Sequence, residues 1–247
     1  MRRRVLVVCL SVLVAVMVCP ARAAMYDLTT EGSAWTINGA VFQQYSDGAG
    51  GSGNIDSFVR IQGTEIQQGY NTDYRGTGFP EFDENTSLSF THSLLLSSVP
   101  TVTNGGTSYR EFLLDINQNG EPILSLDAVK IAVQASGDLF GYSSIFSSPI
   151  YDLDAGGDNW VKLDYSINAG SGAGDMLMYV PDIVFQDGSG GYLGDYVYLY
   201  SKFGENSLAD DGYEEWAHGV GGPIIPEPAT VLLLGLGALA LPKKRRA

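Results

Sequence analysis

Four oxygen-bearing side chains lie close together in the sequence, around an Asn-Gly pair. Asp115 and Asn117 precede the pair, Asn119 is its first member, and Asp127 follows it. Asn-Gly is a strong signal for a two-residue hairpin, and side chains alternate between the two faces of each strand. We therefore expect a hairpin that gathers these four side chains, and oxygen clusters of this kind suit calcium.

The same stretch partly follows the calcium-binding loop of EF-hand proteins. Its residue types match the first, third, fifth and sixth positions of that loop. The pattern then fails, because the twelfth position is Leu126 and the acidic Asp127 comes one residue late. Two interpretations stay open: an ordinary hairpin, or a calcium site formed by Asp115, Asn117, Asn119 and Asp127.

A second candidate is an alternating run of tyrosines, Tyr196, Tyr198 and Tyr200. In a strand the intervening Val197 and Leu199 would face the core, so the tyrosines would face the opposite side. Exposed tyrosine rings stack on sugar rings, and their hydroxyl groups add a polar contact. The run predicts a glycan-binding face, and aromatic packing against neighbouring strands is the alternative.

Few residues in the sequence indicate catalysis. The two histidines, His92 and His218, lack the spacing of a zinc motif, and the sequence has no Gly-x-Ser-x-Gly elbow or phosphate-binding loop. Glu214 and Glu215 are adjacent, so in a strand they would face opposite sides and would not form a glycosidase pair. We expect a protein that is not an enzyme; a hydrolase built from distant carboxylates is the remaining catalytic interpretation.

The elements that must position these residues are short alternating runs of apolar and polar residues, separated by turns rich in Gly, Asn, Asp and Ser. This pattern is typical of an all-β domain, and we expect a β-sandwich of the jelly-roll kind over residues 24–222. The strands are expected at 34–42, 57–62, 87–96, 109–117, 123–134, 160–167 and 195–203.

The charge of this region limits its partners. Residues 24–225 contain 27 of the 28 acidic residues but only six of the 14 basic residues, a net charge of −21. Nucleic acids and anionic lipids bind cationic patches, so neither is expected as a partner. Both cysteines, Cys9 and Cys19, precede this region, which excludes disulfides and thiolate metal sites from it.

The N-terminal residues have the three parts of a secretory signal peptide. Arg2–Arg4 are basic, Val5–Val18 are almost all apolar, and the small residues Ala21 and Ala23 precede a cleavage site before Ala24. The apolar stretch is shorter than the about 20 residues that span a bilayer. We therefore predict that signal peptidase removes residues 1–23.

The C-terminal residues combine three features in order. Pro226, Glu227 and Pro228 are followed by an uncharged stretch over 229–241 and then by four basic residues, Lys243, Lys244, Arg245 and Arg246. A helix over 229–241 would be about 20 Å long, which is less than the roughly 30 Å hydrocarbon core. Because basic flanks stay on the cytoplasmic side, we expect a helix that holds the chain only transiently in the inner membrane, with the domain outside.

In these features the segment 224–247 resembles the PEP-CTERM sorting signal, a family of C-terminal tails that exosortases recognise. The resemblance implies export in a Gram-negative bacterium, removal of the tail by a membrane-embedded exosortase, and delivery to the cell surface or an extracellular polysaccharide matrix. The body also resembles unassigned exosortase-dependent surface proteins, through residues 111–118 and 198–204. That second resemblance implies no biochemical activity.

Three functions follow from these observations. The first is an acidic, non-enzymatic protein of the cell surface or extracellular matrix. The second is a carbohydrate-binding module for extracellular polysaccharide, and the third is a secreted hydrolase that uses carboxylates. No cofactor other than calcium is indicated by the sequence.

Overall fold

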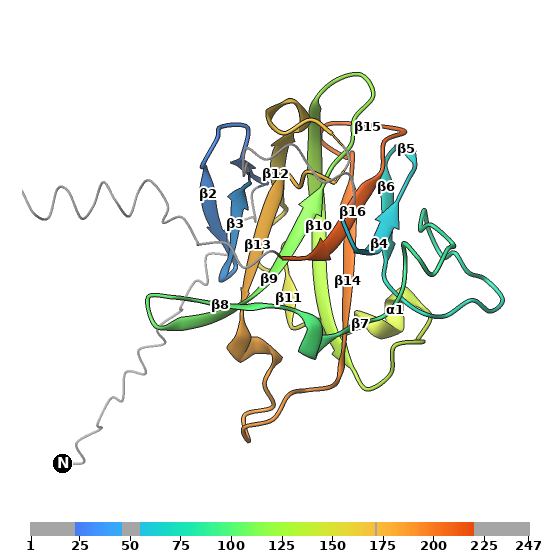
Figure 1. Ribbon diagram of the computed structural model, residues 1–247, viewed down its shortest axis with the longest axis vertical. Coiled ribbons are helices and arrows are strands. Elements are labelled where there is room, and N and C mark those ends of the chain that lie inside the picture. The colour runs from blue at the N-terminus through green and yellow to red at the C-terminus, as the bar shows by residue number, and fades with distance from the viewer. Residues whose placement is uncertain (1–22, 46–54, 171, 220–247) are drawn as a thin grey trace, which may run out of the picture.

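The computed structural model describes residues 23–45, 55–170 and 172–219. Two mostly antiparallel sheets of seven strands face each other (Figure 1). The first sheet has the order β1-β12-β10-β14-β6, with β11 paired to β10 and β7 paired to β14. Its strands are β1 (Ala24–Asp27), β6 (Gln67–Tyr70), β7 (Leu94–Leu95), β10 (Ile123–Gln134), β11 (Tyr151–Asp152), β12 (Asn159–Asp164) and β14 (Tyr196–Phe203).

The second sheet has the order β2-β3-β13-β9-β16-β4, with β8 paired to β9. Its strands are β2 (Ala34–Ile37), β3 (Ala40–Gln44), β4 (Ser57–Ile61), β8 (Thr101–Asn104), β9 (Thr107–Asp115), β13 (Met176–Pro181) and β16 (Glu214–His218). The shorter elements are β5 (Thr64–Glu65), which pairs with β15 (Ala209–Asp210), the helix α1 (Tyr142–Ile145), and the 3-10 turns η1 (Leu96–Ser98), η2 (Tyr165–Ile167) and η3 (Asp182–Phe185).

Eight of these strands have jelly-roll topology. The second sheet contains the neighbours β4-β16-β9-β13 and the first contains β6-β14-β10-β12, all antiparallel. Along the chain these strands pass from one sheet to the other at every connection except the one from β10 to β12. Two interlocked Greek keys of this kind define the jelly roll, so the predicted fold class is confirmed.

The core lies between the two sheets and is formed by the alternate side chains of their strands. In β9, Phe112 and Leu114 face inward, and in β10 Val129 and Ile131 do the same. Trp216 of the second sheet is fully buried, and its Nε1–H donates to Ser201 Oγ of the first sheet at 3.0 Å. Because fully burying one large apolar side chain contributes about 1.5–3 kcal/mol, this layer is the main source of stability.

The expected strands are reproduced unevenly. The range 123–134 is β10 itself, and 57–62, 109–117 and 195–203 correspond to β4, β9 and β14 within two residues. The range 87–96 is wrong, since only Leu94–Leu95 is a strand there. The range 34–42 is two strands, β2 and β3, joined at Asn38 and Gly39, which both have positive φ as a tight hairpin turn requires.

The hairpin predicted at Asn119-Gly120 is also wrong. β9 belongs to the second sheet and β10 to the first. The residues between them therefore cross from one sheet to the other and do not join two paired strands. Neither Asn119 nor Gly120 has the positive φ of a hairpin turn. Their backbone N–H groups instead donate to the carboxylate of Asp210, with a distance of 2.7 Å from Asn119.

Candidate functional site

The four residues predicted to bind calcium have different hydrogen-bond partners. Asp115 ends β9 and accepts hydrogen bonds from the backbone N–H groups of Gly172 (2.8 Å) and Gly174 (3.0 Å). The backbone N–H of Asn117 donates to Glu214, and Asn119 contacts Asp210. Among the described residues, no three Asp, Glu, His or Cys side chains are placed to hold a metal ion together. Asp115 and Asp127 lie in strands of different sheets and share no hydrogen-bond partner in the described part of the chain, so these contacts lend the calcium prediction no support.

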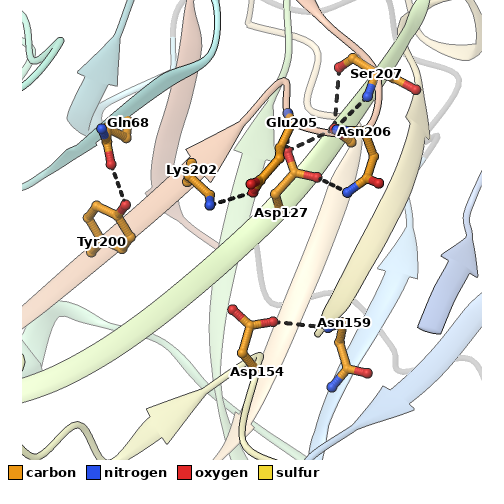
Figure 2. A network of polar contacts seen from close by, with 10 residues as sticks. Gln68, Asp127, Asp154, Asn159, Tyr200, Lys202, Glu205, Asn206 and Ser207 are labelled. Atoms are coloured by element: carbon orange, nitrogen blue, oxygen red, sulfur yellow. Dashed lines mark hydrogen bonds and ion pairs between the residues drawn. The ribbon is translucent and has the colours of Figure 1, made fainter. Parts of the chain in front are cut away.

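Asp127 serves a different purpose, shown in Figure 2. It lies where the register of β10 against β14 shifts, between Leu126 and Ala128. Its carboxylate accepts hydrogen bonds from the Ser125 hydroxyl (2.8 Å), the Glu205 N–H (2.7 Å) and the Asn206 side-chain amide (2.8 Å). Ser125 Oγ in turn accepts from the N–H groups of Asn206 and Ser207. Asp127 therefore fixes the turn that follows β14.

The tyrosine run is not an exposed face, so the predicted stacking platform is wrong. Tyr198 and Tyr200 are only 1% and 5% exposed, and Tyr196 is half-buried. They do point away from the core between the sheets, but other segments cover them, including Phe82, Phe146 and α1. The Tyr198 hydroxyl donates to Ser136 O (2.8 Å) and accepts from the Leu139 N–H (2.9 Å).

A buried group of carboxylates, which we call the acidic cluster, lies at the Asp115 end of β9. Its members are Asp115, Asp175, Glu214 and Glu215, each no more than 4% exposed. Glu215 forms an ion pair with Arg60 at 2.8 Å. Asp175 Oδ2 accepts from the Ile116 N–H, whereas its Oδ1 is buried and has no hydrogen-bond partner.

Burial and mutual repulsion control the protonation of the acidic cluster. Burial, with the neighbouring charge of Asp115, raises the pKa of Asp175 well above its usual value. Burial likewise raises the pKa of Glu214 well above its usual value, and Asp175 and Asp115 add to the shift. The pKa of Asp115 is also raised, mainly by burial. We therefore expect Asp115, Asp175 and Glu214 to retain protons at a pH where exposed carboxyl groups have lost theirs.

The other half of β9 contributes to a pocket of about 210 Å³ at the opposite end of the strand, which we call the Arg110 pocket. The residues around it belong to β7, η1, β9 and the segment that leads into β14. Its lining residues are Leu95, Leu96, Ser97, Arg110, Tyr192, Gly194, Asp195 and Tyr196.

Arg110 is 6% exposed, and the structure compensates its charge fully. Its Nε–H donates to Asp182 at 2.5 Å, Nη1 donates to the carbonyls of Leu96 and Val99, and Nη2 donates to the Tyr192 hydroxyl at 2.8 Å. The guanidinium also lies 5.2 Å from the centre of the Tyr192 ring. No sequence pattern indicates this pocket, because its lining residues come from three separate segments, 95–97, Arg110 and 192–196.

The predicted processing residues lie mostly outside the described part of the chain. This applies to Ala21, to Pro226, Glu227 and Pro228, to the expected helix 229–241, and to the basic residues of 243–246. Ala23 and Ala24 are described, and Ala24 is the first residue of β1. Within the ranges that the structure covers, no helix is long and apolar enough to cross a membrane.

Comparison with known families identifies the C-terminal segment. Residues 225–246 match the family model of the PEP-CTERM protein-sorting motif. The chain carries a PEP-CTERM sorting motif. The motif indicates exosortase-dependent processing and sorting to the cell surface or the extracellular space. No curated protein and no solved structure matches the chain.

Proposed function

We propose that residues 24–222 form an acidic, non-enzymatic protein of the cell surface or extracellular matrix. In this proposal signal peptidase cleaves before Ala24, the segment 229–241 holds the chain transiently in the inner membrane, and an exosortase then removes the tail. The match of residues 225–246 to the PEP-CTERM sorting motif is the observation that carries the proposal.

The start of the folded domain supports the proposed signal cleavage. β1 begins at Ala24, whose N–H donates to Asp158 O at 2.9 Å, and Ala23 is exposed before it. A cut between these two residues would remove nothing from the sheet. β1 pairs in parallel with β12 from its first residue onward, so the mature domain would keep this edge strand complete.

The environment of the acidic side chains supports a non-enzymatic role. A carboxylate hydrolase needs two carboxyl groups that face each other across a cleft, at roughly 5–10 Å. The acidic cluster is buried, and backbone N–H groups, Gln67 and Arg60 bind most of its oxygen atoms. In the Arg110 pocket, Asp182 is engaged by Arg110 and Gln186, which leaves Asp195 without a second free carboxylate beside it.

Intact-mass measurement on protein from the native host tests this proposal. The expected mass lacks both residues 1–23 and the residues that follow the sorting tripeptide. The double variant Pro226→Ala/Pro228→Ala should keep the tail and remain in the membrane fraction, because it loses the fixed extended backbone of this segment. Pro223→Ala, just outside the matched residues, is the matched control and should be processed normally. Recovery of the complete 247-residue wild-type chain would overturn the proposal.

A further inference from the structure

The Arg110 pocket has the size of a site for one small ring. Its volume of about 210 Å³ is below the roughly 300–1,000 Å³ of pockets that enclose drug-sized ligands. Its lining includes the aromatic and apolar side chains of Tyr192, Tyr196 and Leu95. The lining also includes the hydroxyl of Ser97 and the carboxylate of Asp195. A ring with one apolar face and several hydroxyl groups would match both kinds of lining group.

Tyr192 is held in place before any ligand arrives. Its hydroxyl accepts from Arg110 Nη2 at 2.8 Å and donates to Asp182 Oδ2 at 3.4 Å, while its ring lies over the Arg110 guanidinium. The side chain nevertheless remains 47% exposed. An aromatic group that is fixed but accessible can stack on a ligand with little loss of conformational entropy.

The polar groups of the pocket favour a neutral ligand. Asp182 neutralises Arg110, and four of the five N–H groups of Arg110 already have acceptors. The side chains of Ser97 and Asp195 have no partner among the described residues. The free charge in the pocket is therefore that of Asp195, which accepts hydrogen bonds from hydroxyl groups and repels carboxylates and sulfates.

The rest of the domain gives no cationic group to an anionic ligand. All six basic side chains between residues 24 and 219 contact a carboxylate or a backbone carbonyl: Arg60, Arg75, Arg110, Lys130, Lys162 and Lys202. With a net charge of −21 over residues 24–225, the domain would repel an acidic polysaccharide.

We propose that the Arg110 pocket binds one neutral pyranose unit, with a sugar face stacked on Tyr192 and hydroxyl groups bonded to Asp195 and Ser97. This site replaces the buried tyrosine face as the place where the protein contacts carbohydrate. The proposal is independent of the route of export, so sugar binding and tail processing can fail separately.

Saturation-transfer NMR on the protein purified from its host tests the site. Glucose, galactose and mannose are the neutral probes, glucuronic acid is the anionic probe, and soluble neutral glucans and galactans present the same rings within a chain. At least one neutral sugar should bind at millimolar concentration, and glucuronic acid should bind at least tenfold more weakly. Binding of the monosaccharide alone would assign the pocket to free sugar, and binding of both forms would assign it to a polysaccharide unit.

Variants locate the binding within the pocket. Tyr192→Ala should weaken binding by about tenfold, which corresponds to about 1.4 kcal/mol, and Asp195→Ala should weaken it severalfold. The matched control is Tyr213→Ala, because Tyr213 is 37% exposed and also lies over a guanidinium, that of Arg60 at 4.9 Å, but does not line the pocket. Thermal melting identifies any variant that has lost its fold, in which case Asp195→Ala and Ser97→Ala decide the question.

Three results would overturn the proposal. One is the absence of saturation transfer from every neutral sugar at about 100 mM, far above a millimolar dissociation constant. Another is binding that Tyr192→Ala and Asp195→Ala leave unchanged. The third is binding of glucuronic acid with the same affinity as the neutral sugars, which would contradict the argument from charge.

Discussion

Buried charged side chains lie toward both ends of β9. Near one end the charge is paired with an opposite charge, whereas near the other most of the charged groups that the structure describes are acids without a cation. At one end Arg110 meets Asp182, two backbone carbonyls and a tyrosine hydroxyl. At the other end Asp115 lies with Asp175, Glu214 and Glu215, and Arg60 is the one cation that an ion pair places there among the described residues. At the first end an ion pair compensates the buried charge, whereas at the second burial raises the pKa of Asp115, Asp175 and Glu214.

This difference explains why the two ends suit different roles. A buried ion pair with every group bonded holds its surroundings in one geometry, which a binding pocket needs. A buried carboxyl oxygen without a partner, such as Asp175 Oδ1, costs free energy whenever the group is ionised. The number of hydrogen-bond donors around a buried acid should therefore decide whether replacing that acid lowers or raises the free energy of unfolding. Asp182, Asp127 and Asp175 test this, in order of decreasing expected loss.

The largest effect is expected from Asp182→Ala, which leaves the Arg110 guanidinium buried without its anion. Such losses cost about 3–5 kcal/mol, measured here as the free energy of unfolding in urea. The control is Glu205→Ala, which removes the exposed Lys202–Glu205 pair of Figure 2 and should cost less than about 1 kcal/mol. Equal losses of unfolding free energy for the two variants would show that the buried ion pair of Arg110 contributes no more than an exposed pair.

An intermediate effect is expected from Asp127→Ala. This acid has no cation but accepts three hydrogen bonds, and the variant leaves buried donors unsatisfied at a cost of about 1–3 kcal/mol. The loss should be the same in calcium and in chelator, because protein groups occupy the carboxylate. A loss seen only in calcium would restore the metal interpretation of this residue.

Asp175→Asn should act in the opposite direction and stabilise the domain at neutral pH. The folded state raises the pKa of Asp175, so it binds more protons than the unfolded state. Stability then falls as pH rises from the unfolded value near 4 through the folded value, by at most about 1.4 kcal/mol per pH unit for each proton. Urea unfolding between pH 4 and 8 should give a flatter profile for the variant. A steeper profile, or a destabilised variant, would contradict the assignment.

The smallest effect concerns Glu84, whose pKa burial raises to about 6. Its carboxylate accepts from the N–H groups of Tyr70 and Phe82, which offset part of the burial. NMR titration of the side chain should give a midpoint near this value, and stability contributed by its protonated form should be lost as pH rises from about 4 to 6. A midpoint at the ordinary glutamate value would show that Glu84 is more accessible to water than the structure indicates.

The sorting motif, the fold class and the central strands could all be predicted from sequence patterns. The sorting features are local and contiguous, so residues 225–246 could be recognised without a fold. β10 was predicted over its full range because apolar residues recur along it with a period close to two, although the bulge between Leu126 and Ala128 shifts which positions face inward. Asn38-Gly39 and Asn119-Gly120 are the same turn signal, but only the first joins two paired strands. The dipeptide alone does not indicate whether the strands on either side of it pair with each other.

Which side of each sheet is covered, and which charged side chains meet, could not be predicted in this way because both depend on contacts between distant segments. Tyr198 and Tyr200 alternate as an exposed face would, yet the chain around residues 82 and 142–146 packs over them. Arg110 and Asp182 are 72 residues apart, and the members of the acidic cluster come from separate strands and loops. Contacts of this kind depend on how the chain crosses between the sheets, and the local periodicity of the sequence does not contain that information.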